Sequence, residues 1–408
     1  MIFLHSGEHV PVPAKNTSNH TDLVGDARKC LYDQSRLLAP DATLSAIHDL
    51  KHWVGEELAF EEAASASFGR IISELAHSEY LDQLPPLLNK FDRLVCAYYI
   101  RRGSVPSFHG FCNAWREGVL QRVLLFAEEG LELNDPGDPP VPYALLVAGS
   151  LGRREQTLDD ENRYFLIWRE GDSAYFDGFV YRIMAILEQC GLTGNVGPAD
   201  IDRFLWRGSL ADWQRVTSSH SDARNRACPD LLADLRQVCG DPDVGSEAER
   251  LGRLNLERYR SGAPFAALAG RTLVEPVALT VLGGIRVEKS GEHVGSFNVA
   301  RSGLDPLVHA VRLLALQQDL DPAPTLERLS ALTQMRVLEE PFAKRLEGAY
   351  HLLAGLKIGR EMVLEKPYIN LASLPATQQQ KLKEALRSVS QLQRHLRRML
   401  VKLRRREK

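Results

Sequence analysis

The sequence predicts an α+β protein that is mostly helical, with a helical region first, a small α/β domain in the middle and a helical domain last. Three observations predict this order. Apolar residues recur at helical spacing over residues 21–133, short apolar runs that suit buried strands follow between 143 and 168, and the pattern from about 247 onward is helical again. A dense cluster of helix breakers at 134–142 separates the first two patterns.

The length of 408 residues suits two or three domains. The first 20 residues are polar and contain two prolines, so we expect a flexible terminus there. The expected order is then a helical region over 21–135, a small α/β domain over 140–245, and a helical domain with a basic tail over 246–408.

The first helical region is predicted from three segments. Apolar residues within 44–53 and within 71–76 recur every three or four positions, as one face of a helix requires. The segment 119–129 is strongly amphipathic and is expected to close the region.

The middle domain is predicted from short apolar runs. Residues 143–148 form one run that ends at Gly149, as a buried strand would end, and residues 163–168 form a second. Apolar positions over 176–187 follow a helical period, and 231–238 is a third extended candidate.

The composition excludes several classes of protein. With 44% hydrophobic and 25% charged residues, the chain resembles an ordinary globular protein, and no apolar run has the roughly 18–20 residues that a transmembrane helix needs. The first residues lack the basic and apolar segments of a secretory signal. None of the six cysteines is spaced as CxxC, so a zinc site has little support, and we expect reduced thiols in the cytoplasm.

Charge is distributed unevenly along the chain. The net charge is −3, but residues 391–408 carry eight bases and one acid, which leaves an acidic body that does not suit nucleic acid. One interpretation of the tail is a solvated helix end whose cations suit the helix dipole. The other is a surface for an anionic partner. A protein partner would meet this tail or the helices of residues 21–135.

The most informative stretch runs from Gly149 to Trp168. A buried strand feeds a Gly-Ser turn, where glycine lets backbone N–H groups approach a ligand closely. A short helix after the turn would point its N-terminal amides at the same place. Arg153 and Arg154 add guanidinium donors that suit phosphate, and carboxylates follow before the next strand. Two carboxylates separated by one residue could hold a divalent metal together.

This stretch resembles the nucleotidyltransferase fold of the DNA polymerase beta type. Within it, the chain is similar to the branch that contains the N-terminal domain of protein-PII uridylyltransferase, and most similar to nucleotidyltransferases of the type often fused to CBS or cyclic-nucleotide-binding domains. Their signature is Gly-Ser-x-Gly-Arg-x-Glu-Gln-Thr-Leu, two residues, then Asp-Gln-Asp-Asn. The matching residues here are Gly149, Ser150, Gly152, Arg153, Glu155, Gln156, Thr157 and Leu158.

The resemblance covers roughly residues 90–405. It includes the segments 206–213 and 234–241 and a helical C-terminal domain that begins near Gly303. It implies a small polymerase-beta-like α/β domain and Mg²⁺-dependent transfer of a nucleoside monophosphate from a nucleoside triphosphate to a hydroxyl of a protein or small molecule.

The resemblance also implies site residues. Glu161 and Asp234 fall on positions that hold the metal, and these two together with Asp159 are the catalytic candidates. Five residues are candidates for holding the nucleotide: Gly149, Ser150, Gly152, Arg153 and Arg236.

The chain departs from the family pattern at the metal site. Glu161 replaces the first carboxylate of the pair, and Arg163 replaces the second, although a guanidinium cannot ligate a metal. One way to restore a carboxylate pair is a shift of the strand by two residues, which would pair Glu161 with Asp159 or bring in Asp160. A second is a single ion held between Glu161 and Asp234. The alternative to both is an ordinary ion pair of Glu161 with Arg163 in place of the metal.

Two functions therefore remain open from the sequence. One is a nucleotidyltransferase impaired by Arg163. The other is a catalytically inactive nucleotide sensor or protein-interaction module on the same fold. Arg153, Arg236 and Arg312 could each form structural ion pairs instead of contacting a ligand, and Trp206 suits a core position better than base stacking.

Overall fold

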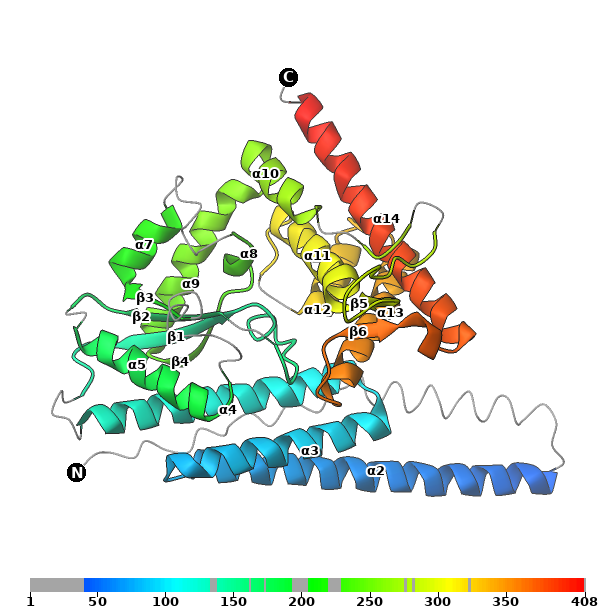
Figure 1. The fold of residues 1–408 in the computed structure, drawn as a ribbon, viewed down its shortest axis with the longest axis horizontal. Helices are drawn as coiled ribbons and strands as arrows, with labels where there is room; N and C mark the ends of the chain where they lie inside the picture. The colour runs from blue at the N-terminus through cyan, green and yellow to red at the C-terminus, as the bar shows by residue number, and fades with distance from the viewer. Residues whose placement is uncertain are drawn as a thin grey trace. The chain divides into compact units, whose positions relative to one another are not determined.

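The chain divides into two compact units, Met1–Gly118 and Val119–Lys408, and each is described by itself (Figure 1). The expected flexible terminus at residues 1–20 lies outside the described residues. In the computed structural model the described residues are 40–132, 138–160, 163–171, 174–192, 205–218, 229–274, 277–280, 283–321 and 324–406.

The described part of the first unit is a bundle of three helices with an aromatic core. Phe68 stacks on Phe111, with ring centroids 3.6 Å apart, and meets the edges of Phe91 and Tyr98. Because aromatic side chains bury a large apolar area each, this cluster supplies much of the packing between the helices. The elements are α2 (Pro40–Ala76), η1 (Leu81–Gln83), α3 (Leu84–Arg102) and the first part of α4 (Val105–Glu132).

The second unit contains a four-stranded mixed sheet in the order β3-β2-β1-β4. The central strand β1 pairs antiparallel with β2 and β4, and β2 pairs parallel with β3. Strand β1 is buried along its whole length, which explains its unbroken apolar sequence. The strands are β1 (Tyr143–Ala148), β2 (Arg163–Trp168), β3 (Leu205–Ser209) and β4 (Arg236–Gly240).

Helices cover both faces of this sheet. On one face, Phe176 of α5 stacks on Trp168 and meets the edge of Tyr143. On the other face, Trp213 of α7 meets the edge of Phe165 and is completely buried. The helices around the sheet are α5 (Ala174–Gln189), α7 (Leu210–Ser218), α8 (Pro229–Leu232) and α9 (Pro242–Leu256).

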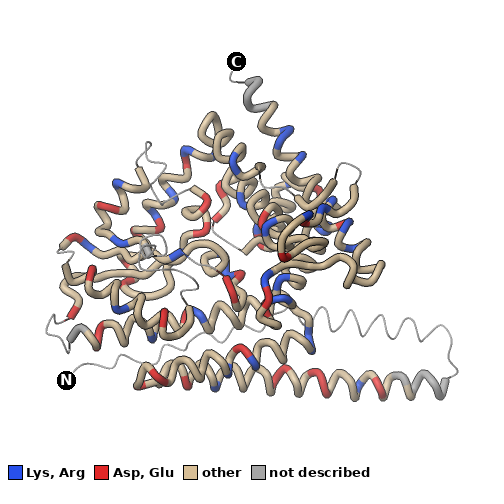
Figure 2. The backbone as a smooth tube through the Cα atoms, in the orientation of Figure 1, with Lys and Arg blue, Asp and Glu red and all other residues tan. Residues whose placement is uncertain are grey.

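The rest of the second unit is helical, apart from the short antiparallel pair β5 and β6. Helix α14 packs along α13, its buried apolar residues extend to Leu400, and Lys and Arg residues recur along it (Figure 2). The elements are η3 (Glu257–Tyr259), α10 (Gly262–Thr272), β5 (Ser296–Asn298), η4 (Ala300–Leu304), α11 (Asp305–Gln317), α12 (Thr325–Gln334), α13 (Glu340–Glu361), β6 (Tyr368–Asn370), η5 (Leu371–Ser373) and α14 (Ala376–Arg406).

The fold class predicted from the sequence is confirmed, since the described residues are mostly helical with one small mixed sheet. One local prediction needs correction, because the extended candidate at 231–238 is in fact the end of α8, a turn and the start of β4. The helix predicted at 119–129 is confirmed as the C-terminal part of α4. In the described residues no helix is long and apolar enough to cross a membrane.

Candidate functional site

The Gly-Ser turn after β1 is closed by its own backbone. Gly149 has φ 88°, a left-handed conformation that glycine adopts without strain. The N–H of Glu155 bonds the carbonyl of Ser150 at 2.7 Å, and Arg154, with φ 59°, bonds the carbonyl of Leu151 at 3.1 Å. This pair of bonds is the pattern that ends a helix. The expected short helix is therefore a single turn that terminates at once.

Gly152 lets this turn press against the backbone beside Asp234. A Cβ atom at Gly152 would lie 2.0 Å from the carbonyl oxygen of Asp234 and 3.0 Å from the Cα of Ala148. Both neighbours are backbone atoms that no side-chain rotation can move away. Close packing within the domain therefore accounts for this glycine without a ligand.

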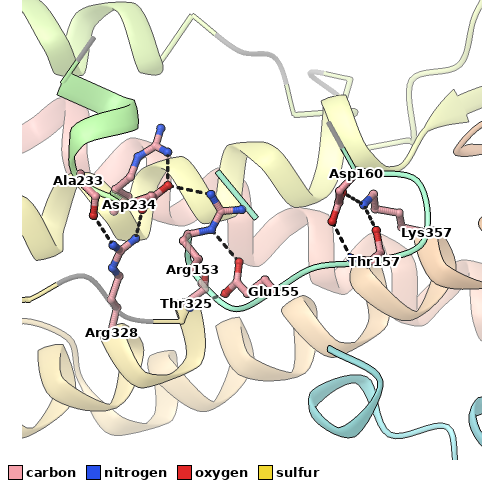
Figure 3. A network of polar contacts seen from close by, with 10 residues as sticks. Arg153, Glu155, Thr157, Asp160, Ala233, Asp234, Thr325, Arg328 and Lys357 are labelled. Carbon is pink, nitrogen blue, oxygen red and sulfur yellow. Dashed lines mark hydrogen bonds and ion pairs between the residues drawn. The ribbon is translucent and has the colours of Figure 1, made fainter. Parts of the chain in front are cut away.

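The Asp234 carboxylate binds three arginines (Figure 3). Its Oδ2 accepts from Nη1 of Arg153 and from Nη1 of Arg312, both at 2.8 Å, and its Oδ1 accepts from Nη1 of Arg328 at 2.9 Å. Asp234 is 0% exposed. A carboxylate has about four acceptor positions, so the arginines use most of its capacity.

Further acids balance these arginines. Arg153 also donates through Nε to Glu155 at 2.8 Å, and Arg312 donates to Asp230 at 3.1 Å. The second oxygen of Glu155 accepts the backbone N–H of Thr325, the first residue of α12, at 2.5 Å. Three acids thus face three arginines in a buried network that joins the turn to α11 and α12. We call these six charged residues the Asp234 network.

Electrostatics keep Asp234 ionised. Burial by itself would raise the pKa of Asp234, but the guanidinium groups of Arg312, Arg153 and Arg328 outweigh burial and hold it well below the usual value. Conversely, although burial alone would lower the pKa of Arg153, the charges of Asp234 and Glu155 raise it above the ordinary value. The pair of Asp234 and Arg153 therefore stays ionised over the physiological pH range.

These residues do not fit a divalent metal. An ion at Asp234 would have to displace a guanidinium and would then lie beside the remaining positive charges, which repel it. Among the described residues no group of three or more His, Cys, Asp or Glu side chains could hold a metal. In this arrangement arginine supplies the positive charge around Asp234.

A second cluster joins the same segment to α13. Lys357 contacts Asp160, Thr157 Oγ1 at 2.8 Å and Glu361 at 3.0 Å. Glu361 in turn accepts from Thr157 Oγ1 at 3.1 Å and from the N–H of Leu158 at 3.2 Å. The segment from Arg153 to Asp160 is thus bonded to the helical domain at both ends. The Asp234 network holds one end, and this Lys357 cluster holds the other.

The Lys357 cluster contains opposed pKa shifts. Burial acts to raise the pKa of Asp160, but the charge of Lys357 lowers it to about 2. Burial raises the pKa of Glu361, and its contact with Lys357 only partly compensates. Lys357 itself has a pKa above the ordinary value, because the two carboxylates outweigh its burial. Lys357 is thus held as a cation beside Asp160 and Glu361.

The structure describes two of the three remaining carboxylate candidates. Glu161 lies outside the described residues. Asp159 is exposed in the turn that precedes β2, and Asp160 is held by Lys357. The metal assignments to Glu161, Asp159 and Asp160 therefore stay predictions, whereas Asp234 has arginine partners.

Two arginines flank the turn on opposite faces of the sheet. Arg163, the first residue of β2, pairs with Ala148, and Arg236 of β4 pairs with Val147. Directly opposed residues share a face and successive residues alternate, so Arg163 and Arg236 lie on different faces. Arg236 donates to the carbonyl of Leu151 at 3.0 Å and so braces the turn.

Sequence reasoning missed Arg328, Lys357 and Glu361. Arg328 lies 94 residues beyond Asp234 in the sequence. Lys357 and Glu361 lie about 200 residues beyond Thr157. Only the resemblance of the helical C-terminal domain, which contains Arg328, to the family could have pointed to this residue. A lysine and a glutamate one helical turn apart are common on solvated helices, so nothing marked Lys357 and Glu361.

Two strands joined through a Gly-Ser turn, with a helical domain bonded to that turn, define a protein of the nucleotidyltransferase class. The family model described as "Putative nucleotidyltransferase DUF294" matches residues 89–227, and the model described as "Putative nucleotidyltransferase substrate binding domain" matches residues 263–400. The chain belongs to this nucleotidyltransferase family, as the sequence resemblance predicted. No curated protein matches the chain.

Proposed function

We propose that the chain is a catalytically inactive member of its family. It binds a nucleoside triphosphate beside the Gly149-Ser150 turn but does not transfer the nucleoside monophosphate to an acceptor. The observation that carries the proposal is the engagement of Asp234 by Arg153, Arg312 and Arg328. Metal-dependent transfer needs acidic side chains that can accept an ion. Here the buried acid is already neutralised by protein cations.

Opening the Asp234 network for a metal would be costly. Removing one partner from a buried ion pair costs about 3–5 kcal/mol, because the remaining charge is left uncompensated. Asp234 is fully buried, and two of its three partners, Arg312 and Arg328, are buried as well. Metal binding at Asp234 would have to offset that loss of ion-pair energy before it could increase nucleotide affinity.

Arginines also support binding of an anion near the turn. Arg154 is exposed at the end of the turn, and Arg163 lies at the adjacent end of β2. Guanidinium groups match the geometry of phosphate oxygens and stay charged at all relevant pH values. We therefore assign the phosphates to Arg154 and Arg163, with Gly149 and Ser150 supplying the turn. In this assignment Gly152, Arg153 and Arg236 maintain the shape of the site.

The competing function is Mg²⁺-dependent transfer of a nucleoside monophosphate to a hydroxyl of a protein or small molecule. The family descriptions, which include a substrate-binding domain at residues 263–400, support it. It requires Glu161 to hold an ion with another acid, either Asp159 or Asp234. In the second case an arginine must leave the Asp234 network.

The proposed setting is the cytoplasm, where nucleoside triphosphates are abundant and thiols stay reduced. In the described residues four cysteines form no disulfide: Cys96, Cys112, Cys190 and Cys239. None of them depends on an oxidising compartment for a structural crosslink.

Titration calorimetry of the full chain tests the proposal. ATP, UTP, GTP and CTP are each titrated once with Mg²⁺ and once with EDTA. We expect at least one of them to bind with an affinity that Mg²⁺ leaves within a few fold. Binding only with Mg²⁺ would support the competing transferase, and no binding of any nucleotide would reject both functions.

A further inference from the structure

Helix α14 carries a line of arginines on its exposed side. Arg387, Arg394 and Arg398 are all exposed, and they follow one another after seven and then four residues. Because a helix turns once every 3.6 residues and rises 1.5 Å per residue, these spacings place the three residues in one line of about 16 Å. We call these three residues the arginine row. Figure 2 shows that bases recur along this helix toward the C-terminus.

The arginine row has no acidic partner among the described residues. On α9, by contrast, the exposed Arg250 pairs with Glu247, three residues away, at 2.7 Å. Residues 385–406 of α14 contain no acid, and Glu384, just before them, accepts from Gln380 at 2.6 Å. The row instead keeps two like charges four residues apart, a spacing at which like charges destabilise a helix. Stability of the helix therefore does not explain the row.

The helix dipole does not explain the row either. Cations are favoured by the dipole only within about the last turn of a helix. Since α14 continues to Arg406, even Arg398 lies two turns before that end. The last turns have bases of their own in Lys402, Arg404 and Arg405. The row thus adds positive charge where the helix itself does not need it.

The domain that carries the row is basic. Residues 263–408 contain 23 Lys and Arg but only 14 Asp and Glu, whereas residues 1–262 contain 27 and 39. Next to the row, Arg397 donates to the carbonyl of Leu273 at 2.9 Å, which places α14 beside the end of α10 and its exposed Arg271. The acidic excess that argued against nucleic acid therefore belongs to residues 1–262 and not to the domain of the row.

The surroundings of the row decide among anionic partners. A protein interface needs aromatic or apolar anchors, but α14 contains no Phe, Tyr or Trp, and Val401 is the one large apolar side chain described as exposed on it. A helix on a membrane surface buries its apolar face in lipid, whereas this face of α14, from Leu382 to Leu400, is buried within the unit. Single-stranded nucleic acid is bound by stacking on aromatic side chains, which α14 lacks.

We propose that the arginine row binds the phosphate backbone of double-stranded nucleic acid. Guanidinium groups match the geometry of phosphate oxygens and keep their charge. A duplex presents phosphates at regular intervals, so a straight row can contact several of them without any apolar anchor. Such binding depends on phosphates and carries no preference for base sequence.

Fluorescence anisotropy of a short labelled DNA duplex with the full chain tests the proposal. The titration is made in EDTA without nucleotide, so its result does not depend on the proposed nucleotide site. We expect binding at low salt, with a slope of log affinity against log salt of about −3 or steeper for three or more phosphates. No binding to the duplex at low salt would overturn the proposal.

Two double variants with the same change of net charge locate the binding surface. Arg394→Glu with Arg398→Glu reverses two charges of the row and should weaken duplex binding at least tenfold. Arg250→Glu with Arg253→Glu reverses two exposed arginines of α9 and should leave the affinity within about twofold. Equal losses in both double variants would show an effect of net charge alone and would overturn the row as the binding surface.

Two further measurements guard the interpretation. The row side chains are exposed, so the row variant should keep the circular dichroism spectrum of the wild type and its calorimetric response to nucleoside triphosphates. Arg394→Gln with Arg398→Gln removes the charges without reversing them and should weaken duplex binding in the same direction. Binding of the wild type to phosphatidylserine vesicles but not to the duplex would assign the row to a membrane and contradict the proposal.

Discussion

Arg153 Nη1 donates to Oδ2 of Asp234 at 2.8 Å and joins two residues that lie 81 positions apart. In the family pattern the first residue would face phosphate and the second would hold metal. In this chain they neutralise each other, with Arg312 and Arg328 completing the charge balance. The motif is kept, but its charged side chains hold the domain together.

Replacing Asp234 with asparagine should destabilise the protein strongly. The substitution leaves three guanidinium groups, two of them buried, facing a neutral amide, and we expect a loss of about 3–5 kcal/mol in the free energy of unfolding. Urea denaturation of the full chain measures it. Asp230→Asn is the control, because Asp230 is partly exposed and, among the described residues, pairs with Arg312 at 3.1 Å. Equal effects of the two substitutions would contradict a central role for Asp234.

Gly152→Ala should also lower stability, for a steric reason. The new methyl group would lie 2.0 Å from the carbonyl oxygen of Asp234, so the Gly-Ser turn and the segment that leads into β4 would have to separate. Gly270→Ala, in helix α10, meets no atom within 4 Å and should be neutral or stabilising by about 0.5–1 kcal/mol. The difference between the two thermal midpoints is the measurement. A Gly152→Ala protein as stable as Gly270→Ala would disprove the close packing.

Acid should weaken the Lys357 cluster in a defined window. The pKa of Asp160 falls from an ordinary 3.8 to about 2, so its stabilisation is complete above 3.8 and is lost as the pH falls through about 2. Lys357→Met should therefore destabilise the protein at neutral pH, with a difference from wild type that shrinks across that window. Urea midpoints at a series of pH values measure it.

The control for the acid experiment is Lys344→Met. Lys344 forms an exposed pair with Glu340, one turn away on the same helix α13. Exposed pairs contribute little, so this variant should track the wild type at every pH. A difference between Lys357→Met and wild type that stays constant with pH would show that the ion pair is not its source.

Arg163→Ala should weaken nucleotide binding if Arg163 contacts phosphate. Hydrogen bonds to charged groups contribute about 1.5–3 kcal/mol, which corresponds to roughly a 10- to 100-fold loss of affinity. Arg169→Ala removes an exposed arginine just past the other end of β2 and should leave affinity unchanged. Calorimetric titration of both variants distinguishes the roles. Unchanged affinity in Arg163→Ala would remove Arg163 from the binding site.

Much of the fold could be predicted from the sequence, because its signals are local. The buried strand 143–148 and the second strand 163–168 were predicted with the bounds that β1 and β2 have. The segment 231–238 was predicted as extended, but its first residues complete α8. A short apolar run has no period long enough to separate a helical turn from a strand.

The site was less predictable, since its contacts are long-range. The sequence identified Arg163 as a departure from the metal pattern, and it left open whether Arg153 and Arg312 form structural ion pairs. Both arginines bind Asp234. No local pattern could show that Arg328 joins them, because only folding brings α12 beside the end of α8.

The most direct test of the account is a crystal structure of the full chain soaked with ATP and Mn²⁺, with the anomalous signal of manganese recorded. We predict that Asp234 keeps its bonds to Arg153, Arg312 and Arg328 and that no manganese peak lies within coordination distance of it. The phosphates should lie near Arg163. A manganese ion bound to Asp234, with one of the three arginines displaced, would contradict the account and support an active transferase.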